Sequence, residues 1–287
     1  MPGTLFLVST PIGNLADVSL RALQVLKTVS VVACEDTRVT RRLMERYQIR
    51  TALVSYHEHN ERRRAAELAQ RLLAGEDVAL VSDAGTPGVS DPGYRLLSLA
   101  REKQLPVRVV PGPSAVLAAL SASGLPASGF VFIGFLPTRP SARKRALDSL
   151  AALPYTAVVF ESARRLPRLL LDLAETLGSR PAYLGRELTK IHEEHRWGSL
   201  PELAEWASRQ SLKGEITLVI QAEKAEAAEK GGAALKPMSE ARQPLLARFQ
   251  ELTAAGYTRR QAVKAMARER DLPARLVYER VLTGEDD

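Results

Sequence analysis

The chain has 287 residues with a formal net charge of +7; 45% of the residues are hydrophobic and 25% are charged. This length predicts two domains and a smaller third piece, and the composition excludes an intrinsically disordered chain. No apolar run is long enough to span a bilayer, and the N-terminus lacks the basic segment of a signal peptide. A single cysteine, Cys34, excludes an internal disulfide framework and a multi-cysteine metal site. We therefore expect a cytoplasmic protein without a membrane partner.

Short apolar runs that alternate with helix-like segments predict a parallel sheet within residues 1–121. The expected strands cover residues 5–8, 29–34, 53–56, 78–81 and 107–110. A polar or Gly/Pro-rich loop follows each of them. In open α/β sheets ligands bind at the carboxyl ends of the strands, so these five loops are candidate walls of one site.

The most unusual loop covers residues 82–93 and contains three glycines, two prolines and two aspartates. Asp91 and Pro92 suit the cap and the first position of the helix that follows. Glycine allows a close backbone approach to a ligand, and a carboxylate can hold an ammonium group or a ribose hydroxyl. A tight strand-to-helix turn would have the same composition, so this loop alone does not distinguish the two interpretations.

The apolar runs within residues 122–222 predict a second α/β domain. Its expected strands cover residues 130–135, 156–160, 182–184 and 216–220, with a short one near 195–197. Residues 223–237 are rich in Ala, Glu, Lys and Gly and predict a linker. Residues 238–287 predict a helix-turn-helix-like domain, although a helical cap on the main body fits the pattern equally well. They hold nine basic and eight acidic residues, which is no strong nucleic-acid signature.

Two basic clusters favour a polyanionic partner. Residues 38–64 contain eight arginines against three glutamates, and a second cluster covers residues 139–145. Solvated helix faces are the simpler explanation of such runs. If the clusters bind RNA backbone, the candidate contacts are Arg41, Arg42, Arg62, Arg63, Arg64, Arg143, Lys144 and Arg145.

Several common chemistries lack support. The chain has no Walker loop, no G-x-G-x-x-G after a strand and no G-x-S-x-G elbow. His57 and His59 flank Glu58, but no third metal ligand lies at a suitable spacing, so we expect no metal site here. We expect these three residues to be polar loop residues at the entrance of a substrate site.

Four motifs in order resemble the tetrapyrrole-methylase class of S-adenosylmethionine enzymes: STPIGNL at 9–15, EDTR at 35–38, SDAGTPGVSDPG at 82–93 and VPGPSA at 110–115. Small-molecule members of that class usually have a G-D-P loop after the fourth strand. The longer loop at 82–89 resembles instead the branch that methylates ribosomal RNA. The resemblance covers residues 3–221.

The resemblance implies an α/β fold of two domains, 1–121 and 122–222, with the S-adenosyl-L-methionine cleft between them and a helix-turn-helix-like domain at 238–287. It implies methylation of a cytidine ribose 2′-oxygen at the decoding centre of 16S rRNA, in the small ribosomal subunit, by a homodimer. The cofactor residues it implies are Pro11, Ile12, Asp83, Gly85, Val89, Ser114, Ala115, Phe160, Glu161, Gly214 and Glu215.

The catalytic hypothesis concerns the loop after the second strand. We expect Glu35 and Asp36 at the methyl acceptor and Arg38 on a phosphate. Two other functions remain open: a methyltransferase of the same fold that acts on a small molecule such as a porphyrinoid, and a non-catalytic RNA-binding assembly protein.

Overall fold

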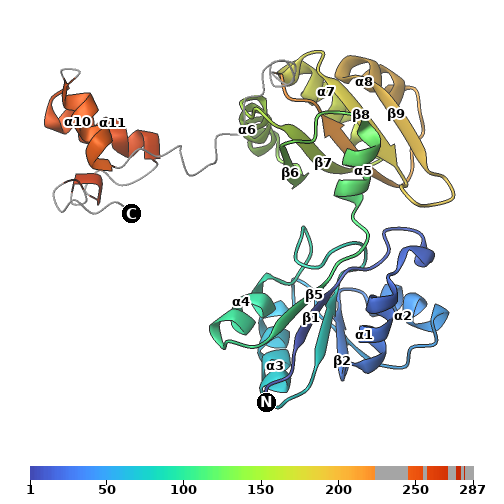
Figure 1. The fold of residues 1–287 in the computed structure, drawn as a ribbon. Helices are drawn as coiled ribbons and strands as arrows, with labels where there is room; N and C mark the ends of the chain where they lie inside the picture. Colours follow the sequence, from blue (N-terminus) through green and yellow to red (C-terminus); the bar gives the residue numbers. More distant parts are fainter. Residues whose placement is uncertain (224–244, 255–256, 271–275, 279–280, 282–287) are drawn as a thin grey trace. The chain divides into compact units, whose positions relative to one another are not determined.

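The computed structural model describes residues 1–223, 245–254, 257–270, 276–278 and 281. The chain divides into two compact units, residues 1–225 and 226–287. The first unit contains two five-stranded sheets, and the second is helical (Figure 1).

The first sheet is entirely parallel, as the alternating pattern predicts. Its strand order is β3-β2-β4-β1-β5, which brings the strand before the 82–93 loop next to β1 and β2. The central strands β2 and β4 are buried along their whole length. The bounds are β1 Leu5–Val8, β2 Val31–Cys34, β3 Ala52–Ser55, β4 Val78–Val81 and β5 Val107–Val110.

Helices cover both faces of this sheet (Figure 1), which explains why its strands are continuous apolar runs. One face packs against α3 (Glu61–Leu73) and α4 (Tyr94–Glu102), the other against α1 (Leu20–Thr28) and α2 (Thr37–Arg46). A short 3₁₀ helix, η1 (Leu15–Asp17), precedes α1. Because all five strands run in one direction, their carboxyl ends share one edge of the sheet.

The second sheet is mixed, with the order β6-β7-β10-β8-β9. Only β6 and β7 pair in parallel; β10, β8 and β9 add antiparallel neighbours. The bounds are β6 Phe130–Phe135, β7 Thr156–Ser162, β8 Pro181–Arg186, β9 Glu194–Ser199 and β10 Glu215–Ile220. These strands confirm the expected second α/β domain.

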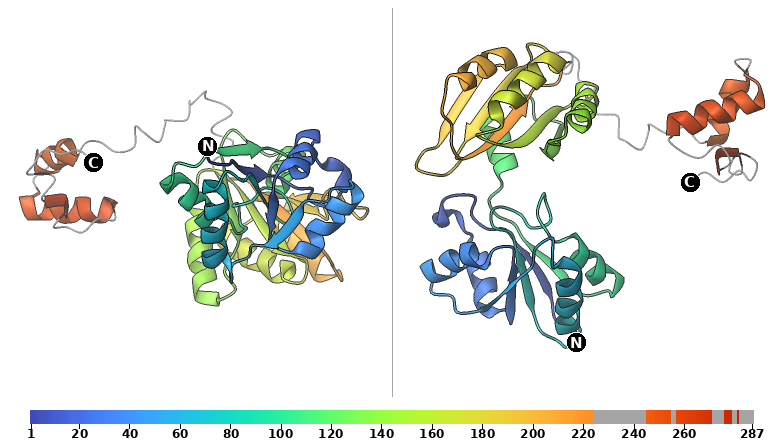
Figure 2. Two further views of the ribbon diagram at one scale, coloured as in Figure 1. Left: turned by 90° about the horizontal axis from the view of Figure 1, so that it is seen from below. Right: turned by 180° about the vertical axis from the view of Figure 1, so that it is seen from behind.

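One face of the second sheet carries α6 (Pro140–Ala151), α7 (Leu166–Leu177) and α8 (Leu200–Ser208), which close a leucine-rich core. The opposite face packs against α5 (Ala115–Ser123), which Figure 2 shows from a second side. This helix follows directly on the first sheet but belongs by its packing to the second. The change of sheet therefore falls at residues 111–114, before the expected boundary at 121.

One sequence prediction in this unit is wrong. Asp91 does not cap the next helix, because α4 begins at Tyr94 with Gly93 as its N-cap. Ser90 and Gly93 both have positive φ, at 63° and 155°. These two reversals turn the chain before the helix starts and direct Asp91 elsewhere.

In the second unit, α10 (Leu245–Ala254) and α11 (Arg259–Arg270) pack around Leu252, Val263 and Met266. Val277 joins this core, while residues 271–275 and the expected linker beyond Glu223 lie outside the described residues. Among the described helices, none has both the length and the apolar character that a bilayer crossing requires.

Candidate active site

A cavity of about 600 Å³ opens between the strand-end loops of the first sheet and the face of the second. The first domain contributes Ile12, Gly85, Asp91 and Ser114 to its walls, and the second contributes Phe132, Phe160, Lys190 and Ile216, among others. This volume falls within the range of small-molecule and cofactor sites.

Two loops of the first domain are joined at the cavity floor. The Thr10 N–H donates to the Gly85 carbonyl oxygen at 2.9 Å, and the Gly85 N–H donates to the Thr10 oxygen at 3.1 Å. The Ser9 and Thr86 hydroxyls lie 3.1 Å apart and share a hydrogen bond. Gly85 has φ +81°, a conformation that L side chains rarely adopt, so glycine is required there. The motifs at 9–15 and 82–93 thus form one preorganised wall.

The N-terminus of α5 forms a second wall. Ser114 is its N-cap, and the Ser114 hydroxyl accepts a hydrogen bond from the Leu117 N–H at 3.4 Å. Ser114, Ala115 and Val116 all line the cavity. The positive end of the helix dipole suits a carboxylate or another anionic group at this point.

Aromatic rings of the second sheet form the opposite wall. Phe132 meets Phe160 edge to face with ring centroids 4.8 Å apart, and Phe135 meets Phe160 at 5.8 Å. Leu188, Ile216 and these rings make this wall largely apolar. Such a surface suits the flat face of a nucleobase.

Asp91 is the carboxylate of this cavity with the most altered acidity among those described. Burial, and then the charge of Glu35, raise the pKa of Asp91 to about 6, against a hydrogen bond from Ser82. Burial and the neighbouring Asp83 also raise the pKa of Glu35. A carboxylate with a pKa near neutrality is a better proton acceptor than an ordinary aspartate.

Two further charged groups at the cavity are held by partners. The buried Glu161 carboxylate pairs with the Arg165 Nε at 2.8 Å and accepts a hydrogen bond from the Ser162 N–H. The Lys190 Nζ contacts Glu187 at 2.7 Å and Glu215 at 2.9 Å. Burial opposes the charge on Lys190, but these two carboxylates outweigh it and raise the lysine pKa.

The expected catalytic loop lies beside the cavity rather than on its wall. Glu35, Asp36 and Arg38 are not among the lining residues. The Arg38 guanidinium binds the Asp36 carboxylate at 2.6 Å, and hydrogen bonds from Arg38 lower the pKa of Asp36 to about 2. Asp36 is therefore a weak base and acts as the N-cap of α2. A direct catalytic role for this loop remains a prediction.

The cavity brings together most of the residues that the resemblance implied for the cofactor. Eight of them line it: Ile12, Gly85, Val89, Ser114, Ala115, Phe160, Glu161 and Glu215. Pro11 and Gly214 are chain neighbours of lining residues. Asp83 instead accepts a hydrogen bond from the Asp36 N–H at 2.9 Å, which ties the second strand end to the fourth.

Sequence reasoning missed the roles of Asp91, Phe132 and Phe135. Asp91 was assigned to a helix cap because Asp before Pro is a common cap signal. The three phenylalanines of residues 130–135 are equally typical of a core strand. Their signal lies in the sheet register, which only the structure provides.

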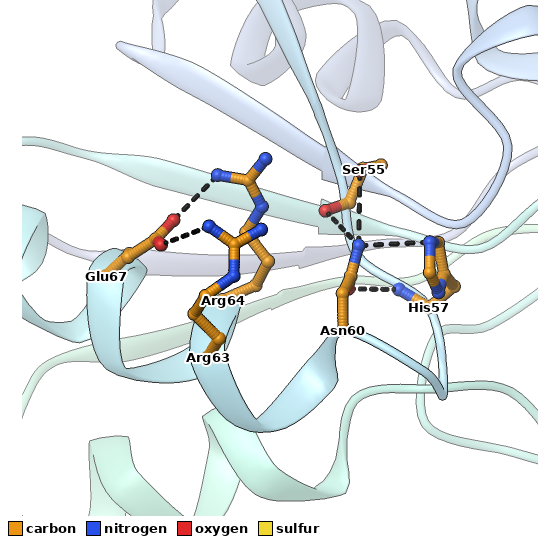
Figure 3. A network of polar contacts seen from close by, with 6 residues as sticks. All are labelled: Ser55, His57, Asn60, Arg63, Arg64 and Glu67. Carbon is orange, nitrogen blue, oxygen red and sulfur yellow. Dashed lines mark hydrogen bonds and ion pairs between the residues drawn. The ribbon is translucent and has the colours of Figure 1, made fainter.

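The two basic clusters differ in what their side chains contact. Arg63 and Arg64 both bind the Glu67 carboxylate, at 2.9 and 2.6 Å (Figure 3). Arg41, Arg42 and Arg62 are exposed, and no ion pair is found for them within the described residues. Of the five candidate arginines in this cluster, Arg41, Arg42 and Arg62 are therefore the freest to bind a phosphate.

The structure corrects the assignment of Arg143 as an RNA-binding residue of the second cluster. Its side chain is 10% exposed, and its Nε lies 2.7 Å from the Asp172 carboxylate in the packing of α6 on α7. Its burial and this ion pair are those of a structural residue, so we no longer expect Arg143 to bind RNA backbone. Lys144 and Arg145 on the same helix are exposed and stay candidates.

His57 belongs to a hydrogen-bonded turn. Asn60 accepts from the His57 N–H at 2.9 Å, and its amide nitrogen contacts the Ser55 carbonyl and the His57 ring (Figure 3). Within the described part of the chain, no group of three or more His, Cys, Asp or Glu side chains is arranged to hold a metal ion.

These features define a fold of two α/β domains with a cavity between the strand-end loops of one and the sheet of the other. A family model described as Tetrapyrrole (Corrin/Porphyrin) Methylases matches residues 4–204, and the chain belongs to this family. A crystal structure of uroporphyrin-III C-methyltransferase from Thermus thermophilus, complexed with S-adenosyl homocysteine, has the same fold. Its TM-score is 0.54 at 23% identity, covering 78% of this chain and 100% of that one.

Among curated relatives, ribosomal RNA small subunit methyltransferase I of Mesorhizobium japonicum is 51% identical over 227 residues, which cover 78% of this chain and 77% of the relative. The protein of the same name from Synechocystis sp. is 42% identical over 286 residues, or 99% of both chains.

Proposed function

We propose that this chain transfers a methyl group from S-adenosylmethionine to the ribose 2′-oxygen of a cytidine at the decoding centre of 16S rRNA. The observation that carries the proposal is the similarity, over 99% of both chains, to a relative named for methylation of small-subunit ribosomal RNA. The choice of cytidine and of the 2′-oxygen goes beyond that name and rests on the resemblance of the four motifs.

The cavity fits the methyl donor. Its volume of about 600 Å³ suits a nucleoside joined to an amino acid. The N-terminus of α5 would hold the donor's carboxylate, and Phe160 with Ile216 would hold its adenine. When bound, S-adenosylmethionine supplies an activated methyl group on a sulfonium.

The residues of this chain then have two tasks. The first is alignment of the acceptor oxygen, which can supply roughly 7–11 kcal/mol of the barrier. The bridge between Thr10 and Gly85 serves this task because it holds the two loops of one cavity wall in a single geometry. Apolar rings on the other wall exclude water from the acceptor.

The second task is removal of the ribose hydroxyl proton. Asp91 lines the cavity, and its pKa of about 6 leaves it ionised yet basic at neutral pH. We assign it as the proton acceptor. Glu35 supports it from behind, since the glutamate charge helps to raise that pKa. A general base of this kind contributes on the order of 10²–10⁴-fold in rate.

Binding of the RNA backbone falls to the exposed cations Arg41, Arg42, Arg62, Lys144 and Arg145. Arg63 and Arg64 can join them at the expense of their contacts with Glu67. The partner is 16S rRNA within the small ribosomal subunit, and we expect the enzyme to act as a homodimer, which light scattering tests.

The decisive experiment is transfer of labelled methyl from S-adenosylmethionine to small subunits from a strain that lacks the corresponding gene. We expect one methylated cytidine ribose, located by primer extension at low nucleotide concentration. Transfer to free tetrapyrroles but not to subunits would establish the small-molecule alternative. Absence of S-adenosylmethionine binding in calorimetry would favour a non-catalytic assembly protein.

A further inference from the structure

A bulge in β6 changes which face of the sheet its last residue occupies. Phe130 and Phe132 line the cavity, whereas Ile133 packs into the core on the other face. Phe132 pairs with Val158, but Gly134 pairs with Val159, the next residue of β7, so Ile133 is an extra residue. Strict alternation would place Phe135 on the face of Ile133, but the bulge returns it to the cavity, where it lines the wall.

Phe135 is more exposed than Phe130, the other large exposed ring of this wall. Its exposed fraction is 59%, against 38% for Phe130. It contacts Phe160 only edge to face, with the centroids 5.8 Å apart. The two rings meet at an interplanar angle of 61°, so Phe135 is not stacked face to face on that neighbour. The sheet places this large apolar ring on the cavity wall, and neighbouring side chains leave it exposed. Such a ring offers a binding surface to a flat ligand.

The same bulge brings Phe135 close to the loop that carries Asp91. Gly134 has φ +72°, and a Cβ atom at that position would lie 3.0 Å from the Ser90 Oγ. The backbone conformation at this position favours glycine, and the two domains approach each other closely there. Ser90, directly before Asp91, therefore lies close to Gly134, directly before Phe135. Asp91 and Phe135 both line the cavity.

We propose that Phe135 is the stacking platform for the base of the target nucleotide, holding it while the attached ribose reaches Asp91. This inference rests on the proposed function and adds the position of the RNA within the cavity. Enzymes that do chemistry on a base take it out of its stack, and unstacked bases in RNA loops bind on aromatic side chains. The ring at the rim, beside the carboxylate, is placed for the base that enters from outside. The more enclosed Phe132–Phe160 pair remains for the donor.

The test compares Phe135→Leu with Phe135→Trp. Leucine keeps an apolar side chain but has no flat π face, whereas tryptophan keeps and enlarges that face. We expect Phe135→Leu to lower kcat/KM on small subunits by about 5- to 150-fold, the range typical of loss of one stacked base. Phe135→Trp should retain at least a third of the wild-type value, and calorimetry should show S-adenosylmethionine affinity within about twofold of wild type in both variants.

Trp197 on β9 is the matched control, because it is also 59% exposed and lies outside the cavity lining. Trp197→Leu should keep wild-type kcat/KM. Equal losses in Trp197→Leu and Phe135→Leu would overturn the platform, and so would a loss of donor affinity in Phe135→Leu. Wild-type kcat/KM in Phe135→Leu would also overturn the stacking platform but would leave the proposed function intact. A wild-type enzyme inactive on subunits would instead contradict the proposed function.

Discussion

At the scale of single residues, the acidity of Asp91 determines how the reaction should respond to pH. The proposed proton acceptor must be ionised to act, and its raised pKa of about 6 places the change of charge near pH 6. We expect single-turnover methylation to be constant above pH 7 and to fall as the pH drops through 6. Asp91→Asn should lower the rate by about 10²–10⁴-fold at pH 8, with donor binding retained in calorimetry.

Glu35 provides the matching variant. Its negative charge disfavours the ionised form of Asp91, so Glu35→Gln should move the acid limb of the profile to lower pH. If Glu35 were itself the proton acceptor, Glu35→Gln would lose the rate at every pH. Wild-type rates in Asp91→Asn would contradict the assignment of Asp91.

Asp91 also shows where prediction from sequence ends. Its motif identifies the loop as a ligand wall, and the alternation of strands and helices predicts the edge on which that loop lies. Whether the Asp91 carboxylate caps a helix or enters the cavity depends on the positive φ of Ser90. A positive φ at a serine has no local signature, so the residue could not be assigned before the fold was known.

At the scale of elements, α6 separates two kinds of basic residue within three positions. Arg143→Ala should lower the free energy of unfolding by about 1–3 kcal/mol, because Asp172 loses one of its two arginines in a mostly buried site. Urea denaturation measures this change. Binding of RNA at a permissive temperature should remain near that of wild type.

The double variant Lys144→Ala/Arg145→Ala should behave in the opposite way. Both side chains are exposed, so we expect stability within about 0.5 kcal/mol of wild type. If each meets one phosphate, the slope of log K against log salt should become shallower by about 1.4–1.8. Weakened RNA binding by Arg143→Ala without loss of stability would contradict this division of the helix.

Charge pattern alone could not separate these residues. Arg143 and Arg145 have the same chemistry and lie two positions apart, which places them on different sides of a helix. The sequence predicts that α6 has a buried side. It does not show that Asp172, 29 positions further along, faces that side on α7.

At the scale of the whole molecule, the two compact units have separate hydrophobic cores. Within the described residues, the four hydrophobic clusters of the first unit draw on residues 5–220, and the cluster around Leu252 and Met266 draws on residues 249–281. A chain that ends at Ala225 should therefore keep its melting temperature and its affinity for S-adenosylmethionine. Methylation of intact small subunits should fall, because the helix-turn-helix-like unit is expected to help in docking on the subunit.

Calorimetry measures the melting temperature, and filter-bound label measures methylation of small subunits, both on the same preparation. The full-length chain is the reference for both measurements. Equal methylation of subunits by the shortened and the full-length chain would show that the helical unit contributes nothing to docking. A lower melting temperature of the first unit would show that the two cores depend on each other.

The chain passes between the two sheets of the first unit once, at residues 111–114, and α5 follows directly with its body on the second sheet. Ile12 from the first domain joins the same core as α5. A molecule held by both the Gly85 loop and the second sheet therefore fastens the two domains to each other. By thermodynamic linkage, an effector that changes the affinity for the donor by some factor has its own affinity changed by the donor by the same factor. Substitutions in the shared core of Ile12 and α5 can therefore change the affinity for the methyl donor without touching the ligand.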